Sequence, residues 1–110
     1  HIPYKKNLKI FNNKILMKCK KNVRIINTSR GELINEKLIF SFLKKKPQSQ
    51  YWTDVIANEQ ARSENIKNDS WIKKLNKLPN FFLTPHIGGA SIDAMYTAEK
   101  YIFNKIKKYL

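Results

Sequence analysis

The sequence is poor in the residues that build the most recognisable sites. Its 110 residues include three glycines, Gly31, Gly88 and Gly89, and a single cysteine, Cys19. Three glycines in these positions cannot form the Gly-x-Gly-x-x-Gly turn that binds dinucleotide phosphates. One cysteine excludes a disulfide framework within the chain, and two distant histidines do not match any metal-site spacing. We therefore expect no metal.

Long apolar runs are also missing. No stretch approaches the roughly 18 apolar residues that a membrane-spanning helix needs, and no signal peptide is visible. We therefore expect no membrane partner. The single cysteine fits a reducing compartment, so we expect a cytoplasmic location. The chain opens with His1 rather than methionine, and we expect it to be part of a longer protein.

Acidic residues are few: 8 Asp and Glu stand against 22 Lys and Arg, which gives a net charge of +14. Such a balance is typical of nucleic-acid-binding modules, and a small module of this kind is one alternative for the chain. The lysines are spread among many Asn and Ile, however, as coding DNA rich in A and T produces. We therefore expect no nucleic-acid partner. The tightest run, residues 44–46, falls at a predicted helix end, where we expect the cations to be solvated.

The remaining composition, 42% hydrophobic and 27% charged, is that of a globular domain. Apolar periodicity predicts strands at 23–27, 51–56 and 81–84, and helices at 12–20, 36–46, 71–78 and from 90 to the end. Asn12 or Asn13, Asn35 and Ser70 are the predicted helix caps, and 57–68 is predicted to be loop. Strands that alternate with helices predict an α/β fold with a parallel sheet.

Polar clusters follow each predicted strand, at 28–31, 54–59 and 86–89. In parallel sheets, ligands bind beyond the carboxyl ends of the strands, so we expect these clusters to converge. Arg30 offers a fork that matches a carboxylate, and His86 is an acid–base group suited to neutral pH. From position alone, an ordinary surface arginine and a loop histidine bonded to backbone remain alternatives.

Two carboxylates belong to the same clusters. Glu59 could orient a histidine and favour its imidazolium form, although by itself it also fits a solvated surface position. Asp54 ends an apolar strand, where an ionised group needs a partner. A ligand amide or a neighbouring helix N-terminus could supply that partner, and the two alternatives stay open.

Four blocks carry a resemblance that runs in order along nearly the whole chain. They are His1-Ile2-Pro3, Ile26-Asn27-Thr28-Ser29-Arg30-Gly31-Glu32-Leu33-Ile34-Asn35-Glu36, Asp54-Val55 with Glu59, and Leu83-Thr84-Pro85-His86-Ile87-Gly88-Gly89-Ala90. The chain resembles the D-isomer-specific 2-hydroxyacid dehydrogenases, in the style of phosphoglycerate dehydrogenase. The resemblance implies the second half of a doubly wound Rossmann-type parallel sheet with flanking helices. Residues 1–90 would be the C-terminal portion of the NAD-binding domain, and 91–110 a helix returning toward a missing substrate domain.

The resemblance also implies an NAD-dependent oxidoreductase that interconverts a D-2-hydroxy acid and a 2-oxo acid. Arg30 would bind the substrate carboxylate, His86 would exchange the proton and Glu59 would pair with His86. The residues implied to contact the cofactor are Thr28, Ser29, Arg30, Asp54, His86, Gly88, Gly89, His1 and Pro3. NADP stays open because the residue that reads the ribose is absent from the chain.

Three further expectations follow from the resemblance. The full-length protein would be a homodimer. Its substrate would be a small 2-hydroxy or 2-oxo acid. The 110-residue piece alone would be inactive, because it lacks the phosphate-binding turn. A remnant that folds but catalyses nothing is the remaining alternative.

Overall fold

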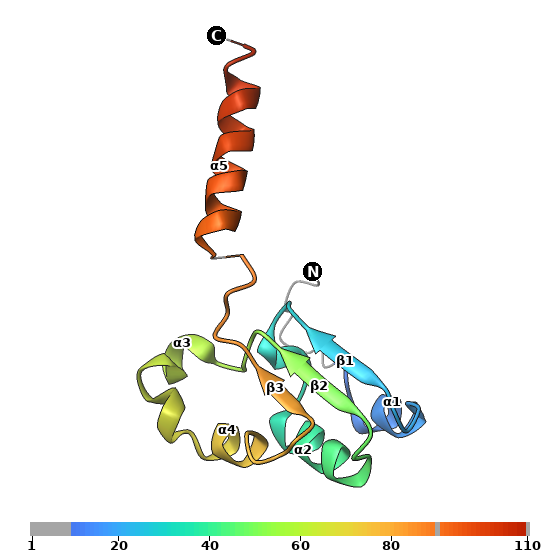
Figure 1. The fold of residues 1–110 in the computed structure, drawn as a ribbon. Helices are drawn as coiled ribbons and strands as arrows, with labels where there is room; N and C mark the ends of the chain where they lie inside the picture. Colours follow the sequence, from blue (N-terminus) through green and yellow to red (C-terminus); the bar gives the residue numbers. More distant parts are fainter. Residues whose placement is uncertain (1–9, 90, 110) are drawn as a thin grey trace.

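The computed structural model describes residues 10–89 and 91–109 and shows short helices connecting parallel strands (Figure 1). In chain order the elements are α1 (Asn13–Lys18), β1 (Arg24–Asn27), the 3-10 helix η1 (Gly31–Leu33), α2 (Glu36–Lys45), β2 (Gln50–Thr53), α3 (Glu59–Arg62), the 3-10 helix η2 (Ser63–Asn68), α4 (Ser70–Leu75), β3 (Phe81–Leu83) and α5 (Ile92–Ile106). The predicted alternation of strands and helices is confirmed.

The three strands form one parallel sheet in the order β1-β2-β3. Ile25 pairs with Tyr51, and Tyr51 pairs with Phe81. All three side chains are buried, and successive strand residues point to opposite faces, so this row marks the inner face of the sheet. Parallel strands joined through helices confirm the predicted α/β fold class.

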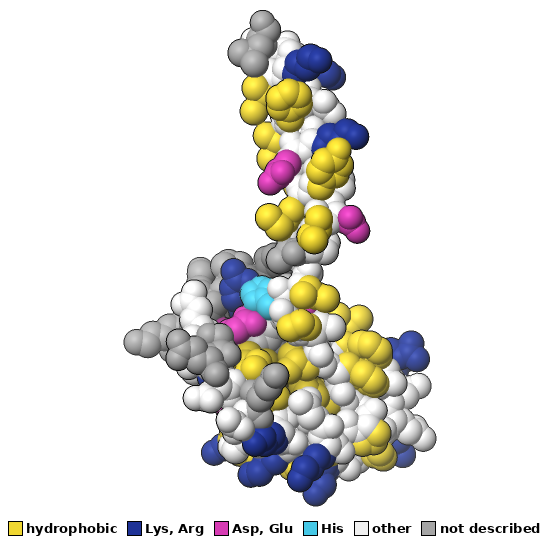
Figure 2. Space-filling view, turned by 60° about the vertical axis from the view of Figure 1, so that its left-hand side comes forward, with side chains coloured by type: hydrophobic (Ala, Val, Ile, Leu, Met, Phe, Trp, Pro, Cys, Tyr) yellow, Lys and Arg dark blue, Asp and Glu magenta, His cyan; other side chains and the backbone are white. Residues whose placement is uncertain are grey.

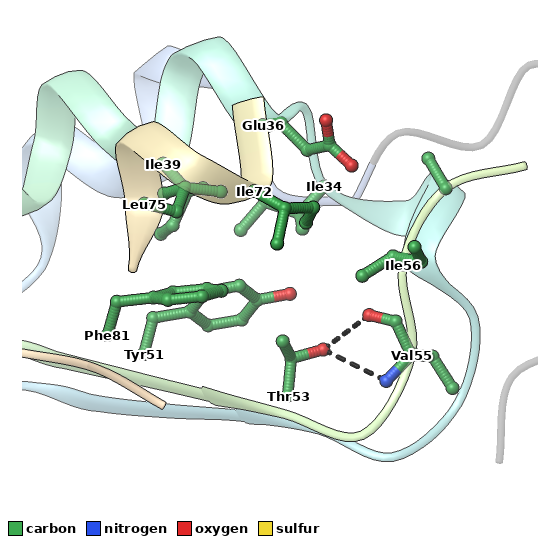
Figure 3. Close-up of a pocket in the computed structure, with 12 residues that line it drawn as sticks. Ile34, Glu36, Ile39, Tyr51, Thr53, Val55, Ile56, Ile72, Leu75 and Phe81 are labelled. Atoms are coloured by element: carbon green, nitrogen blue, oxygen red, sulfur yellow. Dashed lines mark hydrogen bonds between the residues drawn. The ribbon is translucent and has the colours of Figure 1, made fainter. Parts of the chain in front are cut away.

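The core lies between the inner face of the sheet and the helices α1, α2 and α4. Leu16, Ile39 and Leu75 come from these three helices and are at most 2% exposed. In Figure 3 Tyr51 and Phe81 point from the sheet toward the helical side chains above them. The space left between these layers is about 10 Å³, room for about one water. The close packing fixes where each strand ends.

Helix starts follow the predicted capping chemistry in two cases and differ in a third. Asn12 accepts from the Ile15 amide, and Asn35 accepts from the Leu38 amide. At α4 the predicted cap, Ser70, is instead the first helical residue, and Asp69 is the cap. An aspartate caps as well as a serine and adds a negative charge at the helix N-terminus, where it is stabilising.

The basic run at 44–46 differs from its predicted solvation at one position. The Lys46 side chain is half-buried, and its Nζ donates to the carbonyl of Cys19 at 2.6 Å. It also reaches the carbonyls of Leu16 and Met17, both at 3.3 Å. Because the last carbonyls of a helix have no partner within the helix, Lys46 satisfies the end of α1 from α2.

The segment predicted as loop, residues 57–68, is instead helical from Glu59 onward, as α3 followed by η2. Its sequence is polar and α3 has no buried residue, so the periodicity gave no sign of a helix. The turns are held by ion pairs from Arg62, described below.

The outer face of the sheet and the helix α5 are exposed in this structure. On the outer face Ile26 is 70% exposed, and Trp52, 42% exposed, stacks on Phe82 with ring centroids 3.9 Å apart. Helix α5 extends away from the body and buries no residue, although it carries the apolar stripe predicted from the sequence (Figures 1 and 2). Among the helices in the described part of the chain, none is both long and apolar enough to cross a membrane.

Candidate functional site

The segments that follow β1, β2 and β3 meet at the carboxyl edge of the sheet. Arg30, Glu59 and His86, one from each segment, line a single open hollow of about 640 Å³. In Figure 2 the imidazole, in cyan, lies against an acidic side chain below α5. Parallel strands place their carboxyl ends at the same edge, which explains why residues 56 positions apart in the sequence share one site.

The histidine and the glutamate form a direct pair. Nδ1 of His86 lies 2.6 Å from Oε2 of Glu59, and the two side chains are 50% and 32% exposed. Glu59 is the first residue of α3, so the helix start fixes its position. A carboxylate on Nδ1 holds the orientation of the ring. Nε2 is then the nitrogen that can exchange a proton with a ligand.

The backbone at His86 is strained and is held from β2. His86 has a φ of 55°, a left-handed conformation that is uncommon outside glycine. Asp54 secures the following residues, because Oδ1 accepts from the Ile87 amide at 3.0 Å and Oδ2 accepts from the Gly88 amide at 2.7 Å. The Thr84 hydroxyl donates to the same carboxylate. The position of the imidazole is therefore fixed by the hydrogen bonds of Asp54, which directly follows β2.

The charge on Asp54 is stabilised by these contacts. Burial raises the pKa of the Asp54 carboxyl. The hydrogen bonds from Thr84, Gly88 and Ile87 together lower it by more than burial raises it, so the pKa of Asp54 lies below its ordinary value. A Cβ at position 88 would lie 2.9 Å from Oδ2, so only glycine allows the amide to come this close. The sequence left open a ligand amide or a helix N-terminus as the partner of Asp54. In the structure the partners are backbone amides of the chain itself, from the loop at Ile87 and Gly88 and not from a helix N-terminus.

The turn that carries Thr28, Ser29 and Arg30 is organised by Asn27. The buried Asn27 amide donates to the Arg30 carbonyl at 3.0 Å, and its oxygen accepts from the Ser29 amide at 3.1 Å. The Arg30 guanidinium is exposed and donates to the Ser29 carbonyl at 2.7 Å. The role of Asn27 was missed from the sequence, although an asparagine that ends a strand is a turn signal.

A second hollow, of about 530 Å³, lies beside the first on the outer face of the sheet. Thr28, Asp54 and Thr84 line it together with the open apolar row of Ile26, Trp52 and Phe82. Of the four acceptor positions of a carboxylate, Asp54 uses three for Thr84, Ile87 and Gly88, which leaves one on Oδ2.

The first two loops are fastened to each other by Gly31 and Glu32. A Cβ at position 31 would lie 1.9 Å from the Ile56 carbonyl carbon, so the two backbones touch there. Glu32 Oε1 accepts from the Asn58 amide at 2.9 Å, next to Glu59 in the chain. Neither contact could be found from the sequence, because each depends on how the loops meet in space.

Arg62 is a further residue that the sequence did not single out. Its guanidinium donates to both oxygens of Glu36 and to the Ala57 carbonyl, and it pairs with Asp69 at 2.7 Å. Its ion pairs with both carboxylates outweigh the effect of burial and raise the Arg62 pKa. Arg62 thereby connects α3, the helix that begins at Glu59, with α2 and with the N-cap of α4.

The remaining predicted site residues contribute less geometry. Gly89 is exposed and has open space around it. His1 and Pro3 lie outside the described residues. Within residues 10–89 and 91–109 there is no group of three His, Cys, Asp or Glu side chains that could hold a metal ion.

Comparison with known proteins gives one consistent family. The sequence model described as "D-isomer specific 2-hydroxyacid dehydrogenase, NAD binding domain" matches residues 1–88. A glycerate dehydrogenase of Methylorubrum extorquens is 30% identical over 95 residues, covering 86% of this chain and 28% of that protein. D-3-phosphoglycerate dehydrogenase 1 of Saccharomyces cerevisiae is 31% identical over 90 residues, covering 78% of this chain and 19% of that protein.

A solved structure agrees with the sequence comparisons. The NAD-complexed form of a D-isomer specific 2-hydroxyacid dehydrogenase from Lactobacillus delbrueckii ssp. bulgaricus superposes with a TM-score of 0.74 at 25% identity. The match covers 83% of this chain and 29% of that one. The chain thus spans less than a third of the length of each of these relatives.

Proposed function

This chain belongs to the D-isomer specific 2-hydroxyacid dehydrogenase family, and we propose that it carries the acid–base and substrate-anchoring groups of an NAD-dependent oxidoreductase. The proposed reaction interconverts a D-2-hydroxy acid and a 2-oxo acid. The observation that carries this proposal is the shared hollow lined by Arg30, Glu59 and His86, with the carboxylate and imidazole 2.6 Å apart.

In the proposed reaction Arg30 binds the carboxylate of the 2-oxo acid through its planar fork. The protonated His86 donates from Nε2 to the 2-oxo oxygen, where negative charge develops as the ketone is reduced. Glu59 pairs with Nδ1 at 2.6 Å and holds the ring in place. In the oxidative direction His86 takes the proton back from the hydroxyl group.

The residues of this chain fit the reacting end of NAD. NAD, when bound, accepts or supplies the hydride. The free acceptor position on Asp54 Oδ2 suits a carboxamide N–H, and the hollow beside it places Thr28 at the same edge. Ser29, Gly88 and Gly89 are proposed as further contacts of this end. The three glycines of the sequence do not form the phosphate-binding turn, so the rest of the cofactor would be held by other residues.

The alternatives account for less of the geometry. A nucleic-acid-binding module would explain the net charge of +14 but gives no reason for a guanidinium, a carboxylate and an imidazole to share one hollow. An inert remnant would not need the strained backbone at His86 to be clamped by Asp54. We propose a homodimer and a cytoplasmic location for the full-length protein.

The test is an NADH oxidation assay with hydroxypyruvate, carried out on the full-length protein. We expect His86→Asn to lower kcat by roughly 10²–10⁴-fold, because it removes the proton donor. Lys21→Gln, an exposed change before β1, serves as the control and should behave as the wild type. A His86→Asn variant with undiminished kcat would contradict the proposal.

A further inference from the structure

Glu32 is a carboxylate in the proposed substrate hollow for which the proposed reaction has no use. It lines the same hollow as Arg30, Glu59 and His86. We propose that Glu32 is a charge filter that restricts the site to 2-oxo and 2-hydroxy acids bearing a single negative charge. The inference rests on the proposed function and deepens it by naming the substrate class.

The position of Glu32 is fixed from two sides. The backbone of Gly31 is pressed against Ile56 and Ala57, where a Cβ would lie 1.9 and 2.2 Å from backbone atoms. One residue later, Oε1 of Glu32 accepts from the Asn58 amide at 2.9 Å. The side chain is half-buried, so it does not swing freely into solvent. The hydrogen bond from Asn58 thereby holds the Glu32 carboxylate at the lining of the hollow.

The charges around the hollow leave little room for a second anionic group. The lining residues are Arg30, Glu32, Val55, Ile56, Asn58, Glu59, Gln60, Ala61 and His86. Among these described residues Arg30 is the one permanent cation, and it is engaged by the substrate carboxylate. His86 is already paired with Glu59, at 2.6 Å. Among the described residues that line the hollow, a phosphate or second carboxylate on the substrate would therefore meet Glu32 with no further cation beside it.

The physical consequence is discrimination by repulsion. A site rejects a competitor when it places a like charge against it, without any change in its contacts to the preferred ligand. The hollow is open to solvent, so one unit charge acts through partly screened water rather than a dry interior. We expect an effect on the order of tenfold, not one of many orders of magnitude.

The variant Glu32→Gln separates charge from structure. Glutamine keeps an oxygen that can accept from the Asn58 amide, so the contact between the two loops survives while the charge is removed. The matched control is Asp93→Asn in α5, which changes the net charge by the same amount from an exposed position that does not line the hollow. It shows whether the net charge of the whole protein is responsible.

The experiment compares kcat/KM for hydroxypyruvate and for phosphohydroxypyruvate, with 2-oxobutyrate and oxaloacetate as a second pair. We expect the wild type to prefer the singly charged member of each pair. In Glu32→Gln the ratio of doubly or more highly charged to singly charged substrate should rise about tenfold at low salt. The gain should shrink at high salt, and Asp93→Asn should leave the ratio as in the wild type.

The outcomes distinguish this proposal from the proposed function. If His86→Asn abolishes turnover but Glu32→Gln leaves the ratio unchanged, the dehydrogenase assignment stands and the charge filter is wrong. A wild type that prefers the phosphorylated substrate also overturns the filter. If no 2-oxo acid is reduced, or His86→Asn is fully active, the proposed function itself fails.

Discussion

At the scale of single residues, the absence of a Cβ atom matters at one glycine and not at another. Gly31 and Gly89 both lie in segments that follow a strand. Around Gly31 the neighbouring backbone would overlap a Cβ, whereas nothing lies within 4 Å of the Cβ position of Gly89. Neither glycine has a positive φ, so the difference between them is one of space and not of backbone conformation.

We expect Gly31→Ala to lower the free energy of unfolding by about 3 kcal/mol or more, because backbone cannot yield to an added methyl group as a flexible side chain can. Gly89→Ala should change it by less than about 1 kcal/mol. Urea titration followed by circular dichroism measures both values. Equal effects of the two changes would show that the contact between the first two loops is loose.

At the scale of elements, a polar segment is made helical by an ion-pair cluster. Helix α3 contributes no buried residue, and the following η2 has a non-helical kink at Asn65. The Arg62 guanidinium donates four hydrogen bonds, to Glu36, Asp69 and the Ala57 carbonyl, and makes a second ion-pair contact with Asp69 at 2.7 Å. The cluster connects α3, which begins at Glu59, with α2 and with the N-cap of α4, and so stabilises α3.

We expect Arg62→Met to cost about 2–4 kcal/mol of unfolding free energy, because it leaves two partly buried carboxylates without their cation. Arg62→Lys should recover only part of this loss, since an ammonium cannot form the bidentate fork. Hydrogen exchange by mass spectrometry should show faster exchange in residues 59–68. Arg24→Met, an exposed change in β1, is the control. Unchanged protection of α3 in Arg62→Met would contradict this role.

At the scale of the whole molecule, two apolar surfaces are left open. Ile26, Trp52 and Phe82 form a row on the outer face of the sheet, and α5 carries Ile102, Phe103 and Ile106 more than half exposed. Contiguous apolar patches of this kind are uncommon on soluble monomers. The net charge of +14 opposes association of copies, and salt screens that repulsion.

We therefore expect the 110-residue chain alone to self-associate, and to do so more strongly as salt is raised. Sedimentation velocity over a range of concentrations measures it. Ile26→Gln should weaken association, whereas Met17→Gln should not, although the two side chains are almost equally exposed at 70% and 71%. Met17 lies on α1, away from the sheet row. Equal effects of the two variants, or a monomer at high salt, would contradict this expectation.

The sequence by itself determined the alternation of strands and helices, a cap at Asn12 or Asn13 and one at Asn35, and the three clusters that contain Arg30, Glu59 and His86. These features are encoded locally, in apolar periodicity and in the Asn, Gly and Pro residues that end elements. A parallel sheet brings strand ends to one edge, so the convergence of the clusters could be predicted without knowing a single distance.

Only the tertiary structure decided how those clusters are braced. The contacts of Asp54 with Gly88, of Glu32 with Asn58 and of Arg62 with Glu36 join residues 34, 26 and 26 positions apart. The same holds for Lys46 at the end of α1 and for the helical form of residues 59–68. A hydrogen bond between distant residues depends on where the packed core places both partners, and no local pattern in the chain records that position.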